Sequence, residues 1–386
     1  MNQQLNSPVE IKDISIGVFS NFPLVAISLS EIKIEDPIHS KDTLFYCEKL
    51  DLNFNAVDLI NQNYKVRKLK INSGWLNIKI TKTGIKNYLV IKDSNTNKNS
   101  NFRFILDQVS LSNFNIKYQN DILFQEYSFL CNNATLYGDF NDDFYDLEMQ
   151  SDLFINYFVI DKLNYVKNKE VKFSSVINVI NEPFTLKIKE GVLKIAEMDF
   201  SVSGDYLSSS DDKINLSING KNIQLSEVFS VFPLDYFSIL ERYSSKGKLN
   251  FNSTLEGSVS KSNRLLFKAN FNAENASFFD LDNDISMSKI NLKGNYNNAK
   301  EFLEISDFSA FIEDKKISGK FSIKEFKNPL FKFSLKGDLD LAKTSFFIKE
   351  NPVNINGIAS FYLESELKWV NSSPYFKFVT GDVKSK

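Results

Sequence analysis

Residues able to do acid–base or metal chemistry are few in this sequence, and they are scattered. His39, in the stretch DPIHSKD, is the single histidine, which excludes a site with several histidine ligands and leaves any histidine-based triad to one loop residue. Asp280, Asp282 and Asp284 have the alternate spacing of a calcium-binding loop, but Ile285 stands where that loop needs glycine. The chain has no glycine-rich phosphate loop and no Cys-x-x-Cys pair. The sequence therefore predicts an exposed loop histidine and an exposed acidic turn, and it predicts neither an enzyme nor a bound cofactor or metal.

The two cysteines, Cys47 and Cys131, follow no metal-binding or redox spacing. Because a free cysteine behaves as a small apolar side chain, two buried thiols are the favoured interpretation. A disulfide would form only if the fold brought these two residues together.

The charge balance excludes one class of partner. Lys and Arg together number 46 and Asp and Glu 48, so the net charge of −2 gives no reason to expect nucleic acid. The basic groups in residues 65–70 and at Lys315 and Lys316 are interpreted as solvated strand faces and edge charges. No run of about 18 apolar residues is present, so the sequence predicts no membrane-spanning helix.

Short runs in which apolar and polar residues alternate dominate the chain, and this period of two predicts β-strands. Within a run, the apolar side chains lie on one face. The parity of the alternation changes between Ile11 and Ile14 and again between Leu29 and Ile32, as a turn or a β-bulge would cause. The 36 Phe and 15 Tyr agree with this reading, because aromatic side chains suit a pleated, half-buried surface.

Local interruptions separate the predicted strands. Residues 102–118 are interpreted as three short runs divided at Asp107 and Asn113, and residues 56–61 have the spacing of a short helical turn. Dipeptides that favour turns are Asn219-Gly220, Lys246-Gly247, Asn328-Pro329, Gly337-Asp338 and Asn356-Gly357.

Two longer segments break the strand pattern and suggest the domain organisation. Residues 93–101 are polar and rich in turn residues, which predicts a mobile loop. Residues 225–243 have apolar side chains at helical spacing, and Pro233 divides them into two short pieces. The predicted organisation is a β-region at 1–224, a helical punctuation at 225–245, and a second β-region at 246–386 that continues the first.

The order of these β-runs carries a family resemblance. PVEIKDISIGVFSNFPLVAISLSEIKIEDP is followed by YCEKLDLNFNAVDLINQNYKVRKLKINSGWLNIKI, and the second half contains KGKLNFNSTLEGSV, ASFFDLDNDISMSKINLKGNYNN and FLEISDFSAFIEDKKISGKFSIKEFKNPLFKFSLKGDLDL. The first pair resembles the N-terminal region of the AsmA family of bacterial envelope proteins, in which a strand pair around a Phe-Pro (here Phe22-Pro23) leads to a strand, a short helix and a further strand. The later stretches resemble the C-terminal pattern of the same family. Residues 120–181 contribute least to the likeness.

The resemblance implies a fold and a function. AsmA-like proteins are similar to bridge-like lipid-transfer proteins, so it implies a mainly β chain whose long, twisted, curled antiparallel sheet forms an elongated open groove with a few short helices. It further implies a periplasmic protein that is anchored to the inner membrane and conducts phospholipids between the inner and outer membranes. Family members begin with a membrane anchor just before the matched region, so a truncated chain is expected. A role in outer-membrane protein assembly, with outer-membrane components as partners, is implied as an alternative.

A sheet with one apolar face must cover that face. From the residues alone the default cover is a second sheet or a helix, which would make the chain a closed β-sandwich binding module. The predicted helices are too few for this, and about 15–20 strands at about 4.8 Å spacing would extend about 70–95 Å. With the resemblance added, acyl chains become the favoured cover. The residues that alternation assigns to the groove lining are Val25, Ile27, Leu29, Leu50, Leu52, Phe54, Leu76, Ile78, Ile80, Phe102, Phe104, Leu106, Phe114, Ile116, Phe267, Phe331 and Phe333.

Overall fold

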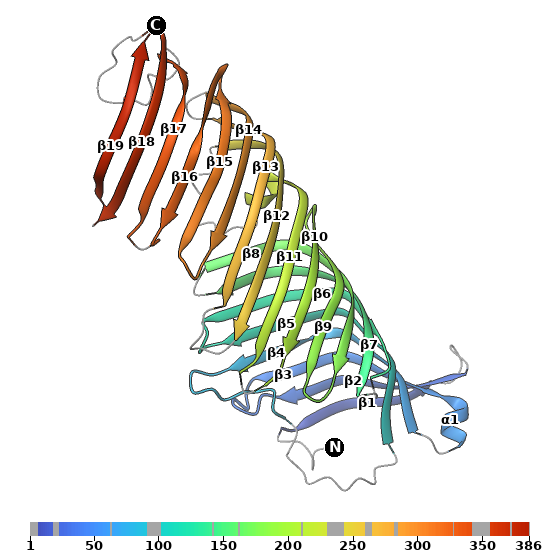
Figure 1. Cartoon of the computed structure of the whole chain (residues 1–386). Coiled ribbons are helices and arrows are strands. Elements are labelled where there is room, and N and C mark those ends of the chain that lie inside the picture. The colour runs from blue at the N-terminus through green and yellow to red at the C-terminus, as the bar shows by residue number, and fades with distance from the viewer. Residues whose placement is uncertain are drawn as a thin grey trace. The chain divides into compact units, whose positions relative to one another are not determined.

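The protein is nearly all β (Figure 1). The structure is a computed structural model that describes residues 7–17, 23–61, 64–90, 102–140, 143–160, 163–209, 211–229, 243–258, 265–281, 285–326, 328–341, 356–370 and 373–385. Nineteen strands form one sheet that is not closed, and these residues include two short helices, so the predicted fold class is confirmed. The chain divides into two compact units, described separately below as unit 1 (Met1–Glu197, Val202–Asp212 and Val231–Leu234) and unit 2 (Met198–Ser201, Lys213–Ser230 and Asp235–Lys386).

Unit 1 is built from the strands of the first half of the chain. They are β1 (Val9–Gly17), β2 (Leu24–Glu35), β3 (Thr43–Asn55), β4 (Tyr64–Ile80), β5 (Phe102–Asn120), β6 (Gln125–Tyr137), β7 (Phe144–Ile160), β8 (Leu163–Ile180), β9 (Thr185–Ile195) and the later part of β10 (Met198–Leu207). From β1 to β9, each strand pairs with the next one in the sequence. The predicted helical turn is α1 (Ala56–Ile60), which begins where Asn55 Oδ1 accepts a hydrogen bond from Val57 N at 2.9 Å.

Unit 2 repeats this arrangement. It contains β11 (Lys213–Gln224), α2 (Leu225–Phe229), β12 (Tyr243–Ser258), β13 (Leu266–Asp280), β14 (Ile285–Asn297), β15 (Phe302–Ile312), β16 (Lys315–Lys324), β17 (Leu330–Asp340), β18 (Ile358–Val370) and β19 (Ser373–Ser385). From β11 to β19 every sequential pair is antiparallel. Of the helical punctuation predicted at 225–245, α2 is the described part; residues 230–242, like the predicted loop at 93–101, lie outside the described residues.

One strand pair departs from the predicted antiparallel sheet. β4 and β5 run parallel, with Leu76 opposite Ile116. A parallel pair needs a crossover that returns the chain to the same end of the sheet, and this takes a dozen or more residues. Residues 81–101 connect the two strands and have the necessary length.

Many strands are longer than the runs visible in the sequence. The three runs predicted in residues 102–118 are one strand, β5, and Asn113 stays within it at a φ of 51°. The parity change between Leu29 and Ile32 has the same origin, because Glu31 has a φ of 47° there. The pairing register of β2 with β3 continues across this residue, so the irregularity predicted from the sequence is a left-handed residue within the strand. A single left-handed residue shifts the alternation by one position, so apolar side chains on both sides of it face the same way.

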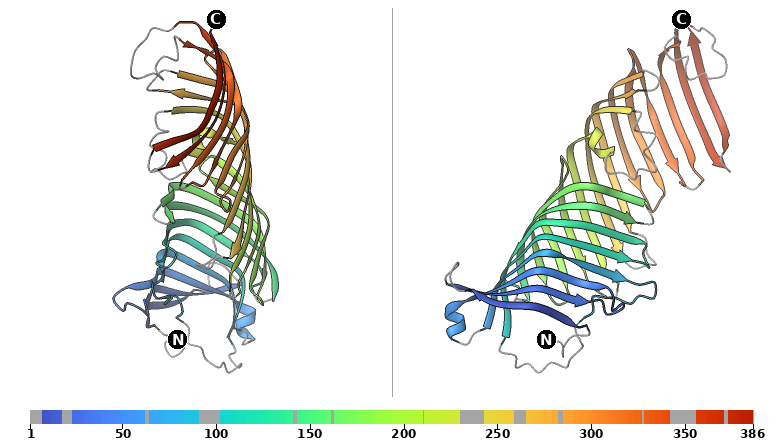
Figure 2. Two further views of the ribbon diagram at one scale, coloured as in Figure 1. Left: turned by 60° about the vertical axis from the view of Figure 1, so that its left-hand side comes forward. Right: turned by 180° about the vertical axis from the view of Figure 1, so that it is seen from behind.

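Irregular positions, at which residues are left out of the pairing or have a left-handed backbone, are aligned from strand to strand. In unit 1 the residues left out of the pairing register form one row across β2 to β6: Glu31, Glu48, Ser73, Asn113 and Asn132. Unit 2 has a comparable series on β11 to β14, with positive φ at Asn222, Gly247, Asn275 and Lys289. Because such irregular positions change the local bend and twist of a strand, an aligned row of them bends the whole sheet. Figure 2 shows this curvature in the strands of each unit.

Glycines in the strands make room for rings of neighbouring residues. A Cβ on Gly74 would lie 2.9 Å from Cε2 of Phe114, one on Gly220 would lie 2.5 Å from Cε1 of Phe251, and one on Gly294 would lie 2.6 Å from Cζ of Phe271. The turn predictions at Asn219-Gly220, Lys246-Gly247 and Gly337-Asp338 are therefore wrong, since these residues lie inside β11, β12 and β17. Asn328-Pro329 and Asn356-Gly357 do precede strands, β17 and β18.

Candidate functional site

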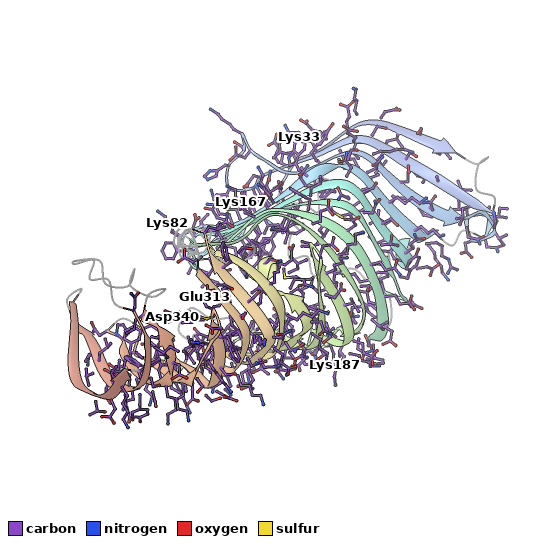
Figure 3. The ribbon with its side chains drawn as sticks, turned by 90° about the horizontal axis from the view of Figure 1, so that it is seen from above. Lys33, Lys82, Lys167, Lys187, Glu313 and Asp340 are labelled. Atoms are coloured by element: carbon purple, nitrogen blue, oxygen red, sulfur yellow. The ribbon has the colours of Figure 1, made fainter. Side chains whose placement is uncertain are left out.

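The face of each unit that carries the apolar side chains is called its inner face. In unit 1, directly opposed residues on β2, β3 and β4 form apolar rows across this face: Ile27–Leu52–Leu69 and Leu29–Leu50–Ile71. On the other side of the row of residues left out of the pairing register, from Glu31 to Asn132, a further apolar row runs Ile32–Cys47–Gly74–Phe114–Cys131 over β2 to β6. Lys33 and Lys187 lie on the outer, convex side of the curved strands (Figure 3), so the inner face of unit 1 is the concave one.

The inner face of unit 2 has rows of the same kind but with more rings and more glycine. One row across β11 to β18 reads Gly220–Phe251–Phe271–Gly294–Ile305–Phe321–Phe333–Ser365. The next row contains Ile223–Leu249–Ala273–Leu292–Phe308–Gly319–Leu335–Leu363. Charged side chains such as Lys320 and Lys332 alternate with these residues and occupy the outer face.

The structure places most of the predicted lining residues on these two faces. Ile27, Leu29, Leu50, Leu76, Phe114 and Ile116 belong to one apolar cluster of unit 1. Val25 lies opposite the buried Phe54, Leu52 opposite Ile27, and Ile78 and Ile80 opposite Tyr118 and Asn120. In unit 2 the ring centroid of Phe267 is 5.9 Å from that of Tyr296, that of Phe331 is 6.1 Å from that of Phe321, and Phe333 lies opposite Phe321. That these residues contact a ligand remains a prediction.

The remaining three predicted lining residues lie near the start of β5. The backbone of Phe102 and Phe104 pairs with that of Tyr64 and Val66, but their side chains lie outside the described part of the structure. Leu106 lies where the pairing of β4 and β5 shifts register, and its carbonyl oxygen accepts a hydrogen bond from Phe140 N at 3.4 Å.

Within each unit, the described residues form no second layer over the inner face, and their helices are only α1 and α2. The accessible surface of the chain is 24309 Å², whereas a compact monomer of 44.3 kDa exposes about 15,500 Å². At the first strand Ile14 and Ile16, which share the inner face with Leu29 and Ile27, are 61% and 69% exposed. A large apolar area of this kind marks a binding surface when it is not an assembly interface or a liability.

A polar cluster that the sequence did not reveal links the turn after β2 to β4 and to Asn87. Asn87 Nδ2 donates hydrogen bonds to Asp36 Oδ2 at 2.8 Å and to the Asn77 carbonyl oxygen at 2.9 Å, and Lys79 N donates to Asn87 Oδ1 at 2.7 Å. Asp36 Oδ1 accepts from the backbone nitrogens of Ile38 and His39 at 2.7 and 3.2 Å. This network holds the turn that carries the exposed His39, so the predicted loop histidine is confirmed.

A stack of three aromatic rings, two of which carry a hydroxyl group, lies on the inner face itself and comes from β5, β6 and β7. The centroids of Tyr118 and Tyr127 are 5.3 Å apart with planes 12° from parallel, and those of Tyr127 and Phe158 are 4.3 Å apart at 10°. Burial, with a smaller contribution from Tyr118, raises the pKa of Tyr127 to about 12. We call Tyr118, Tyr127 and Phe158 the aromatic ladder. Its only signal in the sequence was the aromatic residue in each run.

Both cysteines are buried in unit 1, as predicted, and both are free thiols. They share one row, but Gly74 and Phe114 lie between them, so they do not pair. Burial raises the pKa of Cys47 and that of Cys131 to about 11, which makes either thiol a poor nucleophile in the folded state.

Comparisons of the chain with protein-family models, with curated proteins and with solved structures returned no match. Within the described part of the chain, no helix is both long and apolar enough to cross a membrane. The described residues also contain no group of three or more His, Cys, Asp or Glu side chains that would hold a metal ion. The candidate site is the apolar inner face of each unit, on the evidence of its apolar rows and of its exposed apolar side chains at β1.

Proposed function

We propose that the inner face of each unit binds the acyl chains of phospholipids, and that the protein conducts these lipids between the inner and outer membranes of a bacterial envelope. The observation that supports this is the single-layer sheet, whose described residues leave the apolar inner face of each unit without a protein layer over it. Burying an apolar chain is favourable by about 0.8 kcal/mol per methylene group, whatever the exact position of the chain.

Movement of lipid follows from the direction of the rows. Strands run across each inner face, so the apolar rows run from strand to strand, with a repeat of about 4.8 Å. Because contacts between methylene groups and apolar side chains have no fixed direction, an acyl chain shifts by one repeat without breaking a specific bond. Each unit carries nine strands in sequential pairing, which span about 38 Å. That exceeds half of the hydrocarbon core of a bilayer, about 15 Å, so more than one acyl chain fits along a unit.

The bacterial setting of this proposal rests on the AsmA resemblance. It supplies the periplasmic location, the anchorage to the inner membrane and outer-membrane components as partners. The alternative of a closed β-sandwich does not fit, because the chain forms one sheet where a sandwich needs two.

Native mass spectrometry with lipid extraction, on the chain purified from bacterial cells, tests the proposal. We expect several phospholipid molecules to co-purify with each chain. A lipid-free mass together with a compact small-angle scattering profile would show that the apolar faces are covered by protein, and would contradict the proposal.

A matched pair of variants separates lipid binding from general damage. Phe321→Asp combined with Phe333→Asp places two charges on the inner face of unit 2 and is expected to remove bound lipid from that unit. Ser322→Asp combined with Ser334→Asp adds the same charge to the outer face one residue further along the same strands, and is expected to leave lipid content unchanged. Equal lipid loss in both double variants would argue against the inner face as the binding surface.

A further inference from the structure

The aromatic ladder lies where the inner face of unit 1 meets water. Tyr118 is two residues from the end of β5, and Tyr127 is two residues from the start of β6, with the turn of residues 121–124 between these strands. Tyrosine has an apolar ring and a polar tip, and such residues are favoured at boundaries between apolar and aqueous surroundings. A lipid whose chains lie on the inner face would have its head group at such a boundary.

A hydrogen bond leaves the hydroxyl of Tyr118 ready to donate. Asn120 Nδ2 donates to the hydroxyl oxygen of Tyr118 at 3.1 Å, which uses that oxygen as an acceptor and leaves its proton for another group. Asn120 is itself held in place, because its Oδ1 accepts from Ile122 N at 3.0 Å and Leu123 N at 3.1 Å. The ring of Tyr127 stacks on that of Tyr118, with planes 12° from parallel, so the two phenol groups belong to adjacent, stacked rings.

A lysine shares the inner face with the aromatic ladder. Lys169 on β8 lies opposite Ile155, just as Val171 lies opposite Leu153, so the register places Lys169 on the apolar side. Asn168, next to it, has a left-handed backbone with a φ of 53°. Among the inner-face positions that the described pairing fixes on β2 to β8, Lys169 is the one charged side chain, and it forms no ion pair with a described residue.

The lysine and the ladder occupy adjacent rows. One row runs Tyr118–Tyr127–Phe158–Val166, and the next runs Ile116–Phe129–Ile155–Lys169. An ammonium group and phenol donors at the border of an apolar surface suit an anion with several acceptor oxygens, and lysine is a common phosphate ligand. The apolar members of the second row would contact the chain attached to that anion.

We propose that Tyr118, Tyr127 and Lys169 form a binding site for the phosphate group of a phospholipid head group on the inner face of unit 1. This inference rests on the proposed function, because it assumes that acyl chains occupy the inner face. It adds a preference that an apolar surface alone lacks, namely selection of phosphate-bearing lipids over neutral ones with the same chains.

The test is competitive loading of the full chain from vesicles that contain equal amounts of phosphatidylglycerol and diacylglycerol with identical acyl chains, read by native mass spectrometry. The unmodified chain is expected to take up phosphatidylglycerol preferentially. Lys169→Met is expected to reduce the preference about tenfold, the effect of losing one hydrogen bond to a charged group. Tyr127→Phe and Tyr118→Phe keep the stacked rings and are expected to reduce it several-fold each. The number of lipids bound should stay the same.

Tyr145→Phe is the matched control. Tyr145 lies on β7 in a different apolar cluster of unit 1, with its ring centroid 5.7 Å from that of Phe140. This substitution also removes one tyrosine hydroxyl, and it should leave the lipid preference unchanged. Circular dichroism and thermal unfolding check that each variant remains folded.

The outcomes separate the two proposals. Lipid uptake with a preference that survives Lys169→Met combined with Tyr127→Phe would overturn the head-group site while leaving the proposed function intact. Uptake of neither lipid by the unmodified chain would overturn the proposed function. Binding of inorganic phosphate that depends on Lys169, without any preference between the two lipids, would assign the site to free phosphate and overturn its assignment to a lipid.

Discussion

Both units are built from curved strands in a single layer, but the residues that are buried differ between them. The buried cluster of unit 1 contains Phe114, Leu29, Ile32 and both cysteines, with one alanine. Three of the six residues in the buried cluster of unit 2 are alanines: Ala273, Ala276 and Ala310. Large side chains therefore cover one another in unit 1. In unit 2 half of the buried positions are alanine, and rings such as Phe321 and Phe333 remain partly exposed.

This difference assigns different roles to apolar residues of the same type. A buried ring in unit 1 stabilises the fold, because removing it leaves a cavity. A half-exposed ring in unit 2 contributes less to the fold and leaves more apolar surface for a ligand. The comparison predicts that matched substitutions in the two units will differ in size and in kind.

The largest contrast is expected between Phe114→Ala and Phe321→Ala. Phe114 is 2% exposed and its ring centroid is 5.8 Å from that of Phe45, so its loss should lower the free energy of unfolding of unit 1 by about 3–5 kcal/mol. Phe321→Ala should destabilise unit 2 by about 1–2 kcal/mol, since its ring is already in part solvated. Hydrogen exchange, resolved by peptide, measures both effects.

The two thiols give an independent measurement, because both belong to unit 1 and the chain has no other cysteine. Alkylation of Cys47 and Cys131 requires opening of unit 1, since both are buried with a raised pKa. Phe114→Ala should speed labelling by about a hundredfold or more, and Phe321→Ala should leave it unchanged. Equal acceleration by both variants would show that the units do not differ in this way.

The next largest contrast is between a glycine packed against backbone and a glycine packed against a side chain. A Cβ on Gly74 in unit 1 would lie 2.1 Å from the carbonyl oxygen of Tyr46, whereas the nearest atom to one on Gly220 in unit 2 is Cε1 of Phe251 at 2.5 Å. Backbone cannot move aside, but a ring can rotate. Gly74→Ala should therefore cost about 2–3 kcal/mol and Gly220→Ala about 1 kcal/mol, measured by denaturant unfolding. A larger effect at Gly220 would contradict this account.

A smaller loss of stability, similar in both units, is expected from substitutions at the left-handed residues within the strands. Asn113 in unit 1 and Asn275 in unit 2 have φ values of 51° and 50°, a region that a β-branched residue avoids. Valine at either position should cost about 1–2 kcal/mol, and glycine should be nearly neutral. Thermal unfolding of the four variants measures this. If valine were tolerated in one unit only, the left-handed residues would have different roles in the two units.

The sequence revealed those features that leave a local mark. The alternation identified the strands, and the parity change between Leu29 and Ile32 marked an irregularity, because the left-handed Glu31 shifts the pattern at that place. The helical turn after Asn55 was visible for the same reason. Most predicted lining residues lie on the inner faces because alternation is enough to assign a residue to a face.

Features that depend on which strands are neighbours were not visible. Asn219-Gly220 was predicted as a turn because this dipeptide favours turns. The actual role of Gly220 is to make room for Phe251, a ring on the next strand, and the sequence does not show that the two are neighbours. The ladder and Lys169 come together only through the register of β5 to β8. The parallel pairing of β4 with β5 depends on the path of the connecting segment, which no local pattern specifies.

The smallest expected effect is an alkaline sensitivity confined to unit 1. The pKa of Tyr127 is raised to about 12, from an ordinary value of about 10, because burial disfavours its charged form. A folded-state pKa above the unfolded value means that the stabilisation is complete below about pH 10 and is lost as the pH rises towards about 12. The other described tyrosines with a raised pKa, Tyr145 and Tyr206, also belong to unit 1.

Unit 1 should therefore lose protection from hydrogen exchange at a lower pH than unit 2. Tyr127→Phe should remove part of this pH dependence, because phenylalanine keeps the stacked ring and has no proton to lose. Ultraviolet absorbance of tyrosinate, followed in the unmodified chain and in the variant, would show one fewer late-titrating phenol. Loss of protection in both units at the same pH would mean that alkaline unfolding has another cause.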